Sequence, residues 1–177
     1  EALRALAAAL HGAPEALRAA CARVADWEAL ATLALREGVA GILWRDLARA
    51  GLRPPPGAAS RLERFAVSQR LGQPRLEADL AAALGALAGA GVPCAVLKGP
   101  VLAERLYAEA ALRPSTDLDL LVSAADLDRA LGALGSAGWQ AREGPTARWQ
   151  RRHHHHLVLS RPGATPLELH FRAVTGF

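Results

Sequence analysis

Two aspartates separated by one residue are the part of the sequence best suited to chemistry. Asp117 and Asp119 enclose Leu118 at the start of the apolar run 118–122. If that run is a β-strand, residues i and i+2 point to the same face, so the two carboxylates converge. Convergent carboxylates repel each other unless a cation lies between them. Hard divalent cations such as Mg²⁺ or Mn²⁺ prefer oxygen ligands, so the pair predicts a metal site.

A solvated turn is the competing interpretation of this aspartate pair. The segment 114–116, Pro-Ser-Thr, comes directly before it, and residues of these types are common in turns. Under this interpretation both carboxylates lie in water at the mouth of the strand. The aspartates alone do not decide between the two interpretations, so the choice depends on a segment further upstream.

That upstream segment contains the only lysine of the chain. Lys98 stands beside Gly99, while every other long basic side chain is an arginine. Lysine is a compact point charge suited to a phosphate tail, and glycine lets the backbone approach a phosphate closely. The turn before a predicted helix at 101–110 would also offer free N–H groups to an anion. Together with the aspartates, these residues favour a site for a nucleoside triphosphate and its metal ions, although a surface lysine remains the alternative.

A second Asp-Leu-Asp triplet at 126–128 has a different meaning. Ser123 and Asp126 have the spacing of a capping box that opens a helix to about residue 134. In a helix, residues i and i+2 lie about 200° apart, so Asp126 and Asp128 diverge. This triplet is best interpreted as a helix cap that complements the helix dipole.

Hydrophobic spacing divides the chain into a helical first part and a mixed second part. Residues 1–90 carry apolar side chains at helical spacing, interrupted by Pro-Pro-Pro-Gly at 54–57. From residue 91 the pattern changes to short apolar runs bounded by glycine, which is typical of buried strands. We therefore predict an α+β fold with domains at 1–90 and 91–177. The expected elements of the second domain are strands at 92–97, 118–122, 148–160 and 167–172, and helices at 101–110 and 123–134.

Two details of the helical part can be stated in advance. Asp26 is suited to cap a helix at 27–36. A longer helix from about residue 58 carries an apolar stripe, which is typical of core packing rather than of a ligand site. The stripe consists of Leu76, Leu80, Leu84 and Leu87.

The composition limits the possible classes of protein. An apolar content of 51% excludes general disorder. A net charge of +4 is compatible with phosphate-bearing ligands, but no dense basic run with interleaved aromatics indicates nucleic-acid binding. Two cysteines, Cys21 and Cys94, make no disulfide framework and fit a reducing compartment, so we expect a cytoplasmic protein with no membrane segment. The first residue is not Met and the end follows a predicted strand directly, which suggests a piece of a longer protein. The oligomeric state is not indicated.

An ordered set of short motifs is distributed over most of the chain. The motifs are Val-Leu-Lys-Gly-Pro at 96–100, Leu-Tyr at 106–107, Leu-Arg-Pro-Ser at 112–115, Asp-Leu-Asp-Leu-Leu-Val at 117–122 and Leu-Glu-Leu-His-Phe at 167–171. With this set the chain resembles the nucleotidyltransferase superfamily of the DNA-polymerase-β type, and more narrowly a bacterial family of uncharacterised nucleotidyltransferases. The resemblance implies a helical N-terminal region followed by a catalytic core with a small mixed sheet flanked by helices.

The resemblance also implies roles for individual residues. Asp117 and Asp119 would bind metal, and Glu168 on a neighbouring strand would be the third carboxylate. The reaction implied is two-metal phosphoryl chemistry with Mg²⁺ or Mn²⁺, in which one ion activates the attacking oxygen and the other clamps the triphosphate. A nucleoside monophosphate would move from a nucleoside triphosphate to an unknown acceptor, which is a small molecule, a protein or an RNA. The residues implied in substrate binding are Lys98, Gly99, Arg113, Ser115 and His170.

One departure from the superfamily pattern keeps other functions open. The superfamily usually has Gly-Ser at the first turn, with the serine touching phosphate, whereas Pro100 follows Gly99 here. The triphosphate grip would then depend on Lys98. A catalytically degenerate nucleotide-binding module is one alternative. A glycosyltransferase that holds Mn²⁺ and a nucleotide sugar with its Asp-Leu-Asp triplet is another, and the Lys98 turn and Glu168 argue against it.

A run of four histidines at 153–156 is the last candidate feature. On the predicted strand the four side chains alternate between faces, so at most two share a metal ion, and Arg151 and Arg152 oppose cation binding. We expect one histidine pair to line the site beside the carboxylates rather than to form a zinc site. His170 lies two residues from Glu168 and therefore on the same strand face.

Overall fold

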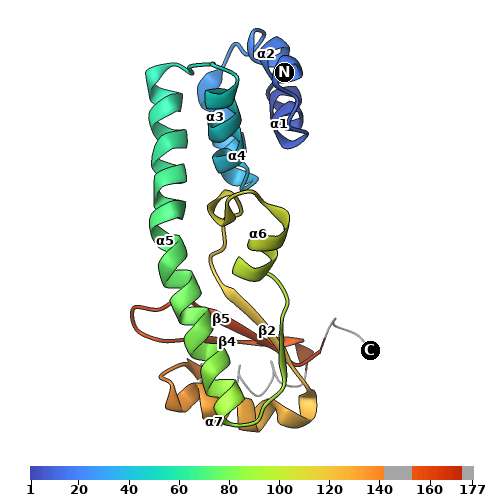
Figure 1. Ribbon diagram of the computed structural model, residues 1–177, viewed down its shortest axis with the longest axis vertical. Coiled ribbons are helices and arrows are strands. Elements are labelled where there is room, and N and C mark those ends of the chain that lie inside the picture. The colour runs from blue at the N-terminus through green and yellow to red at the C-terminus, as the bar shows by residue number, and fades with distance from the viewer. Residues whose placement is uncertain (142–152, 173–177) are drawn as a thin grey trace. The chain divides into compact units, whose positions relative to one another are not determined.

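The computed structural model describes residues 1–141 and 153–172, which form an α+β protein (Figure 1). The α+β prediction is confirmed. Two compact units are present: Glu1–Gly72 with Tyr107–Pro114, and Gln73–Leu106 with the residues from Ser115 onward. These units are groups of residues that contact one another, and they are not the same as the predicted domains. The predicted domain boundary between residues 90 and 91 therefore stays a prediction.

The first unit is helical, as predicted for this part of the chain. Its core is aliphatic and centres on fully buried leucines such as Leu30 and Leu43. The Asp26 carboxylate accepts a hydrogen bond of 2.9 Å from the Ala29 N–H, which confirms the predicted cap. The helices are α1 (Ala2–Leu10), α2 (Pro14–Cys21), α3 (Trp27–Arg36), α4 (Ala40–Arg49), the first half of α5 (Pro56–Gly89) and a 3₁₀ turn, η1 (Ala110–Leu112).

The second unit is built on a five-stranded sheet in the order β1-β2-β5-β4-β3. The central pair β2 and β5 is parallel, and the other neighbours are antiparallel. A parallel pair requires a crossover connection, and α7 (Leu127–Ser136) lies within the connection between these two strands. The strands are β1 (Cys94–Val96), β2 (Leu118–Val122), β3 (Gln140–Ala141), β4 (His156–Ser160) and β5 (Leu167–His170).

One face of this sheet is apolar and the other carries the candidate site. The alternate residues Leu118 and Leu120 of β2, with Leu169 of β5, are almost completely buried against α5 and α7. The predicted leucine stripe of α5 belongs to this core: Leu76, Leu80 and Leu87 are buried and Leu84 is partly buried. Because strand side chains alternate, the intervening residues of β2 and β5 must point to the opposite face.

Two predicted elements differ clearly from the observed ones, and one observed strand was not predicted. The helix expected at 101–110 is shorter, since α6 spans Pro100–Leu106 and Tyr107 already belongs to the first unit. The strand expected at 148–160 begins only at His156, because the N–H groups of Phe171 and Arg172 both donate to the His155 carbonyl and the regular ladder ends there. Residues 148–152 of that prediction lie outside the described residues. The short strand β3 was not predicted.

Among the helices of residues 1–141 and 153–172, none has the length and hydrophobicity that a bilayer crossing requires.

A buried aspartate joins α5 to the loop between β4 and β5. Asp79 is 6% exposed and accepts hydrogen bonds from the Arg161 guanidinium at 2.5 Å and from the Thr165 N–H at 2.7 Å. The same guanidinium lies 3.8 Å from the centre of the Trp139 ring. Burial opposes ionisation, but these hydrogen bonds outweigh it and hold the pKa of Asp79 below its ordinary value of 3.8.

We expect Asp79→Asn to lower the free energy of unfolding by about 2 kcal/mol, because hydrogen bonds to a charged group are lost and Arg161 loses its buried partner. This corresponds to a fall in Tm of about 4–8 °C. The depressed pKa makes this contribution fully present above about pH 3.8 and lost as the pH falls through the folded-state value. Denaturant unfolding between pH 3 and 7 measures both effects. Glu77→Gln, on the exposed side of α5, is the control and should change stability by less than about 0.5 kcal/mol.

Candidate functional site

The register of β2 and β5 brings two carboxylates together on the polar face of the sheet. Asp119 of β2 is paired directly with Glu168 of β5. Both lie between leucines that point into the core, so the alternation of each strand turns both carboxylates to the same face. The predicted position of the Glu168 strand beside the aspartate strand is confirmed.

Lys98 approaches this acidic pair from the end of β1. Its ammonium lies 2.8 Å from Asp119 Oδ1, and its side chain is 51% exposed. β1 is antiparallel to β2, and the Leu97 N–H donates to the Asp119 carbonyl, which places the next side chain beside the carboxylate. The hydrogen bond to Asp119 raises the pKa of Lys98, so its ammonium is charged. The predicted link between the lysine segment and the aspartate segment is therefore a direct contact.

Asp119 is almost fully buried, at 2% exposure, and has a second partner in His170. The distance from His170 Nε2 to Asp119 Oδ1 is 3.1 Å. Burial would raise the pKa of the Asp119 carboxyl, but the hydrogen bonds from Lys98 and His170 outweigh it and hold the pKa below its usual value. A carboxylate accepts only, so His170 donates its Nε2–H to Asp119.

Asp117 lies one residue before β2 and is half-buried. Burial, followed by the negative charges of Asp119 and Glu168, raises the pKa of the Asp117 carboxyl. The structure thus places its charge close enough to sense the other two acids. Asp117 does not, however, belong to the groups of described residues whose ligand atoms all lie within 4.8 Å of one another.

The group that could share a cation consists of Asp119, Glu168 and His170. The two carboxylates suit Mg²⁺ or Mn²⁺. The imidazole is a nitrogen donor, which a transition metal such as Mn²⁺ accepts more readily than Mg²⁺ does. The chemistry of this donor set fits the metal that the sequence predicts. His170 Nε2 is also 3.5 Å from Glu168 Oε2, so one imidazole bridges the two carboxylates.

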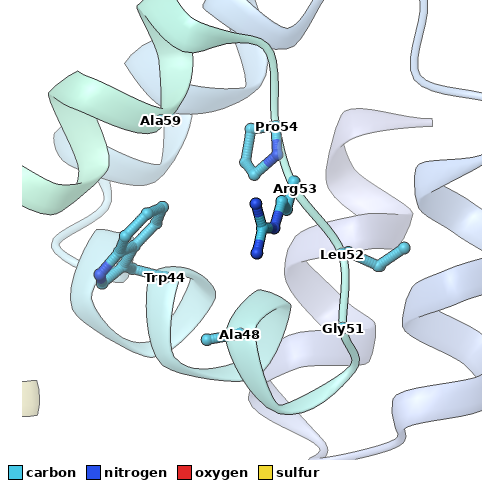
Figure 2. A pocket seen from close by; sticks show the side chains of 7 residues that line it. All are labelled: Trp44, Ala48, Gly51, Leu52, Arg53, Pro54 and Ala59. Carbon is cyan, nitrogen blue, oxygen red and sulfur yellow. The ribbon is translucent and has the colours of Figure 1, made fainter.

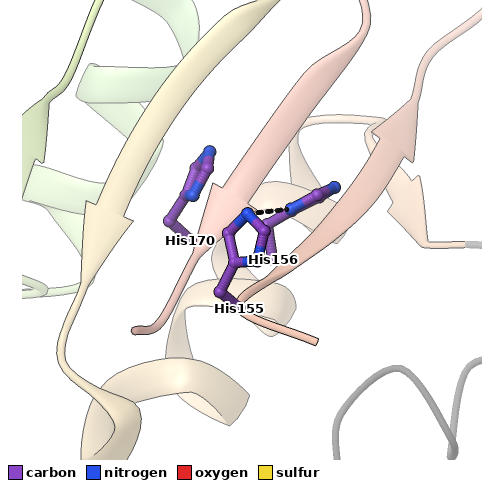
Figure 3. A group of neighbouring side chains, drawn as sticks. All are labelled: His155, His156 and His170. Carbon is purple, nitrogen blue, oxygen red and sulfur yellow. Dashed lines mark hydrogen bonds between the residues drawn. The ribbon is translucent and has the colours of Figure 1, made fainter. Parts of the chain in front are cut away.

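The histidine run differs from its predicted arrangement. The expected alternation placed His155 and His156 on opposite faces of one strand, which is wrong, because β4 begins only at His156. Instead, His156 Nδ1 lies 3.0 Å from His155 Nε2, and the two rings pack edge to face (Figure 3). His156 Nε2 is 3.8 Å from Glu168 Oε1. His156 therefore lies beside Glu168, and its partner is the preceding residue. A role for this pair in lining the site stays a prediction.

The remaining predicted substrate residues are placed as follows. Gly99 is buried and has a φ of 72°, a backbone conformation that favours glycine, and Pro100 begins the short helix α6. Ser115 belongs to the same unit as the carboxylates and is half-buried. Arg113 belongs to the first unit, so its part in the site stays a prediction.

A pocket in the first unit contains none of the predicted site residues. It has a volume of about 550 Å³ and is lined mainly by apolar groups, with the Arg53 guanidinium facing the Trp44 ring across it (Figure 2). The other lining residues are Ala48, Gly51, Leu52, Pro54 and Ala59. The sequence did not predict this pocket, because its lining comes from a helix, a loop and the start of a second helix with no recognisable motif.

Comparison with known proteins adds a finding that is independent of this geometry. Residues 23–176 match the family described as uncharacterised nucleotidyltransferases. No curated protein and no solved structure matches the chain. The family match covers the carboxylates, the lysine segment and most of the helical unit. The chain therefore belongs to the family of uncharacterised nucleotidyltransferases.

Proposed function

We propose that the chain is a metal-dependent enzyme that transfers a nucleoside monophosphate from a nucleoside triphosphate to an acceptor. The observation that carries this proposal is the pairing of Asp119 with Glu168 on parallel strands, with the Lys98 ammonium on Asp119. Family membership supports the transferase class. The mixed sheet with its central parallel pair supports an arrangement of the DNA-polymerase-β type.

Asp117, Asp119 and Glu168 are the residues that would hold Mg²⁺ or Mn²⁺. The ions would supply charge neutralisation on the phosphates and a more reactive attacking oxygen. Asp119 is suited to the central position because burial and two donors keep it ionised. His170 holds the Asp119 carboxylate in place through its Nε2–H.

Lys98 would contact the triphosphate tail. Its ammonium is charged and its side chain is half-exposed, so it can turn from Asp119 toward an anion in the solvent-facing part of the site. Gly99, which is buried and has a positive φ, would let the backbone approach the same phosphates. Ser115, Arg113 and His170 remain the proposed further contacts to substrate.

The acceptor can be identified by transfer of a labelled nucleoside monophosphate to it. Incubation of the protein with each α-labelled nucleoside triphosphate, Mg²⁺ or Mn²⁺ and cell extract should transfer label to one acceptor class: small molecule, protein or RNA. Transfer should disappear when the metal is chelated. Metal-dependent triphosphate binding with no transfer to any fraction would contradict the proposed reaction.

That contrary result would favour a nucleotide-binding module without catalysis. The observation that supports this second candidate is Pro100, which begins α6 where the superfamily usually has a serine that touches phosphate. The two candidates share the metal site and differ only in turnover. We also infer a cytoplasmic location in a bacterium, supported by the free cysteines Cys21 and Cys94 and by the family resemblance.

Lys98→Ala should weaken binding of a nucleoside triphosphate about 10–100-fold, because a charge-assisted contact worth about 1.5–3 kcal/mol is lost. Binding of the matching monophosphate should change less than about threefold, since only the tail is contacted. Calorimetry with Mg²⁺ and each nucleotide measures the difference. Arg105→Ala, which removes an exposed cation of α6, is the control and should leave both affinities unchanged. An equal loss for both nucleotides would mean that Lys98 acts on the fold or on the nucleoside.

A further inference from the structure

Three imidazoles from two neighbouring strand ends lie together (Figure 3), and two of them face the carboxylates of Asp119 and Glu168. His170 belongs to β5, His156 begins β4, and His155 precedes it; β4 and β5 pair His156 directly with His170. The ring centres of His156 and His170 are 5.1 Å apart, and those of His155 and His170 are 5.4 Å apart. One nitrogen from each ring lies within 4.8 Å of the others. The transfer reaction proposed above uses neither His155 nor His156.

The outward nitrogens of two of these rings face carboxylates. His170 Nε2 donates to Asp119, and His156 Nε2 lies 3.8 Å from Glu168 Oε1. Metal-binding histidines almost always direct their second ring nitrogen to a carboxylate, a carbonyl or water in this way. Each ring is thereby oriented with its Nδ1 left for another partner, and His156 Nδ1 lies 3.0 Å from His155 Nε2.

The third ring contributes an unsatisfied atom. His155 Nδ1 is buried and has no hydrogen-bond partner among the described residues. Burying a polar atom without a partner costs free energy. The atom of this ring that faces His156 is Nε2, so Nε2 is the nitrogen that a ligand shared with His156 would engage.

We infer that His155, His156 and His170 form a binding site for one transition-metal ion of the Zn²⁺ class. Imidazole nitrogen is a preferred ligand of Zn²⁺, with a bond length of about 2.0–2.1 Å. Two such nitrogens at tetrahedral positions lie about 3.3 Å apart, close to the 3.0 Å between His155 and His156. His155 and His156 lie outside the group of Asp119, Glu168 and His170, which suits Mg²⁺ or Mn²⁺, while His170 is common to both groups. Binding of Zn²⁺ by the three imidazoles does not depend on nucleotidyl transfer.

Zinc binding by the purified, metal-free protein tests this site directly. Calorimetry with Zn²⁺ alone should show one tight equivalent that persists in excess Mg²⁺, and Co²⁺ should give the visible absorption of a nitrogen-bound ion. Loss of an outer partner of a metal ligand already lowers affinity about 10–100-fold, so His155→Ala should weaken Zn²⁺ binding at least about 100-fold. His153→Ala, which removes an exposed histidine from the same run, should bind Zn²⁺ as the parent chain does.

Two outcomes would overturn the assignment. One is the absence of a tight Zn²⁺ equivalent in the parent chain. The other is equal Zn²⁺ affinity in the parent chain and in His155→Ala, which would place the ion on Asp119 and Glu168 instead. Circular dichroism establishes that the variant is folded, and His155→Asn, which keeps a polar side chain, serves as the second variant. Label transfer with Mg²⁺ in zinc-free buffer reports separately on the proposed enzyme, so failure of one proposal leaves the other measurable.

Discussion

Asp119→Asn should abolish metal-dependent triphosphate binding and reduce nucleotidyl transfer by about a thousandfold or more. Metal ions contribute several kcal/mol of charge stabilisation in phosphoryl transfer, and each 1.36 kcal/mol is a factor of about ten in rate. Asp119 is the residue on which this contribution should depend most, because its carboxylate is buried and contacts both Lys98 and His170. Asparagine keeps the shape but removes the charge, so calorimetry with Mg²⁺ and the triphosphate should show no metal-dependent binding.

The sequence provides a matched control for this variant. Asp128 belongs to the second Asp-Leu-Asp triplet and is exposed on α7. Asp128→Asn changes the net charge by the same amount and should leave binding and transfer within about twofold of the parent chain. Unchanged Mg²⁺-triphosphate affinity in Asp119→Asn would mean that the site lies elsewhere.

The strand alternation around Asp119 could be predicted because it depends on local sequence. Leu118 and Leu120 must face a core, so the residue between them must face the opposite side. The same rule applies to Glu168 between Leu167 and Leu169, and the two strands are indeed adjacent. Local spacing also predicted the Ser123 cap, whose hydroxyl accepts from the Asp126 N–H at 3.1 Å.

Contacts between distant segments could not be predicted in the same way. The hydrogen bond from Arg161 to Asp79 joins residues far apart in sequence, and no local pattern marks either partner. The prediction that the side chains of residues 153–156 alternate between faces was wrong for a related reason. Side chains alternate between faces only where a strand continues. The N–H groups of Phe171 and Arg172 both donate to the His155 carbonyl, and the regular ladder of β4 therefore begins only at His156. The resulting histidine contact therefore depends on where the backbone leaves the sheet.

Glu168 differs from Asp119 in its neighbours, and this difference predicts a different kinetic effect. Lys98, the proposed triphosphate contact, touches Asp119, whereas Glu168 lies one strand further along the sheet and faces His156 and His170. Glu168 should therefore contribute more to the chemical step than to triphosphate binding. The leucines on either side of it face the core and would not be disturbed by a substitution on the polar face.

Glu168→Gln should lower kcat for nucleotidyl transfer about a thousandfold while KM for the triphosphate changes only a few-fold, since a group that acts mainly in the transition state affects kcat and kcat/KM alike. Steady-state kinetics with labelled triphosphate measures both constants. Glu104→Gln, an exposed position on α6, is the control with the same chemical change. If Glu168 binds metal, Glu168→Asp, which keeps the charge on a shorter side chain, should recover part of kcat and the dependence of the rate on Mg²⁺ concentration together. A carboxylate that only orients the imidazoles would not link these two quantities. A Glu168→Gln variant that transfers label within a few-fold of the parent rate would exclude Glu168 as the third metal-binding carboxylate.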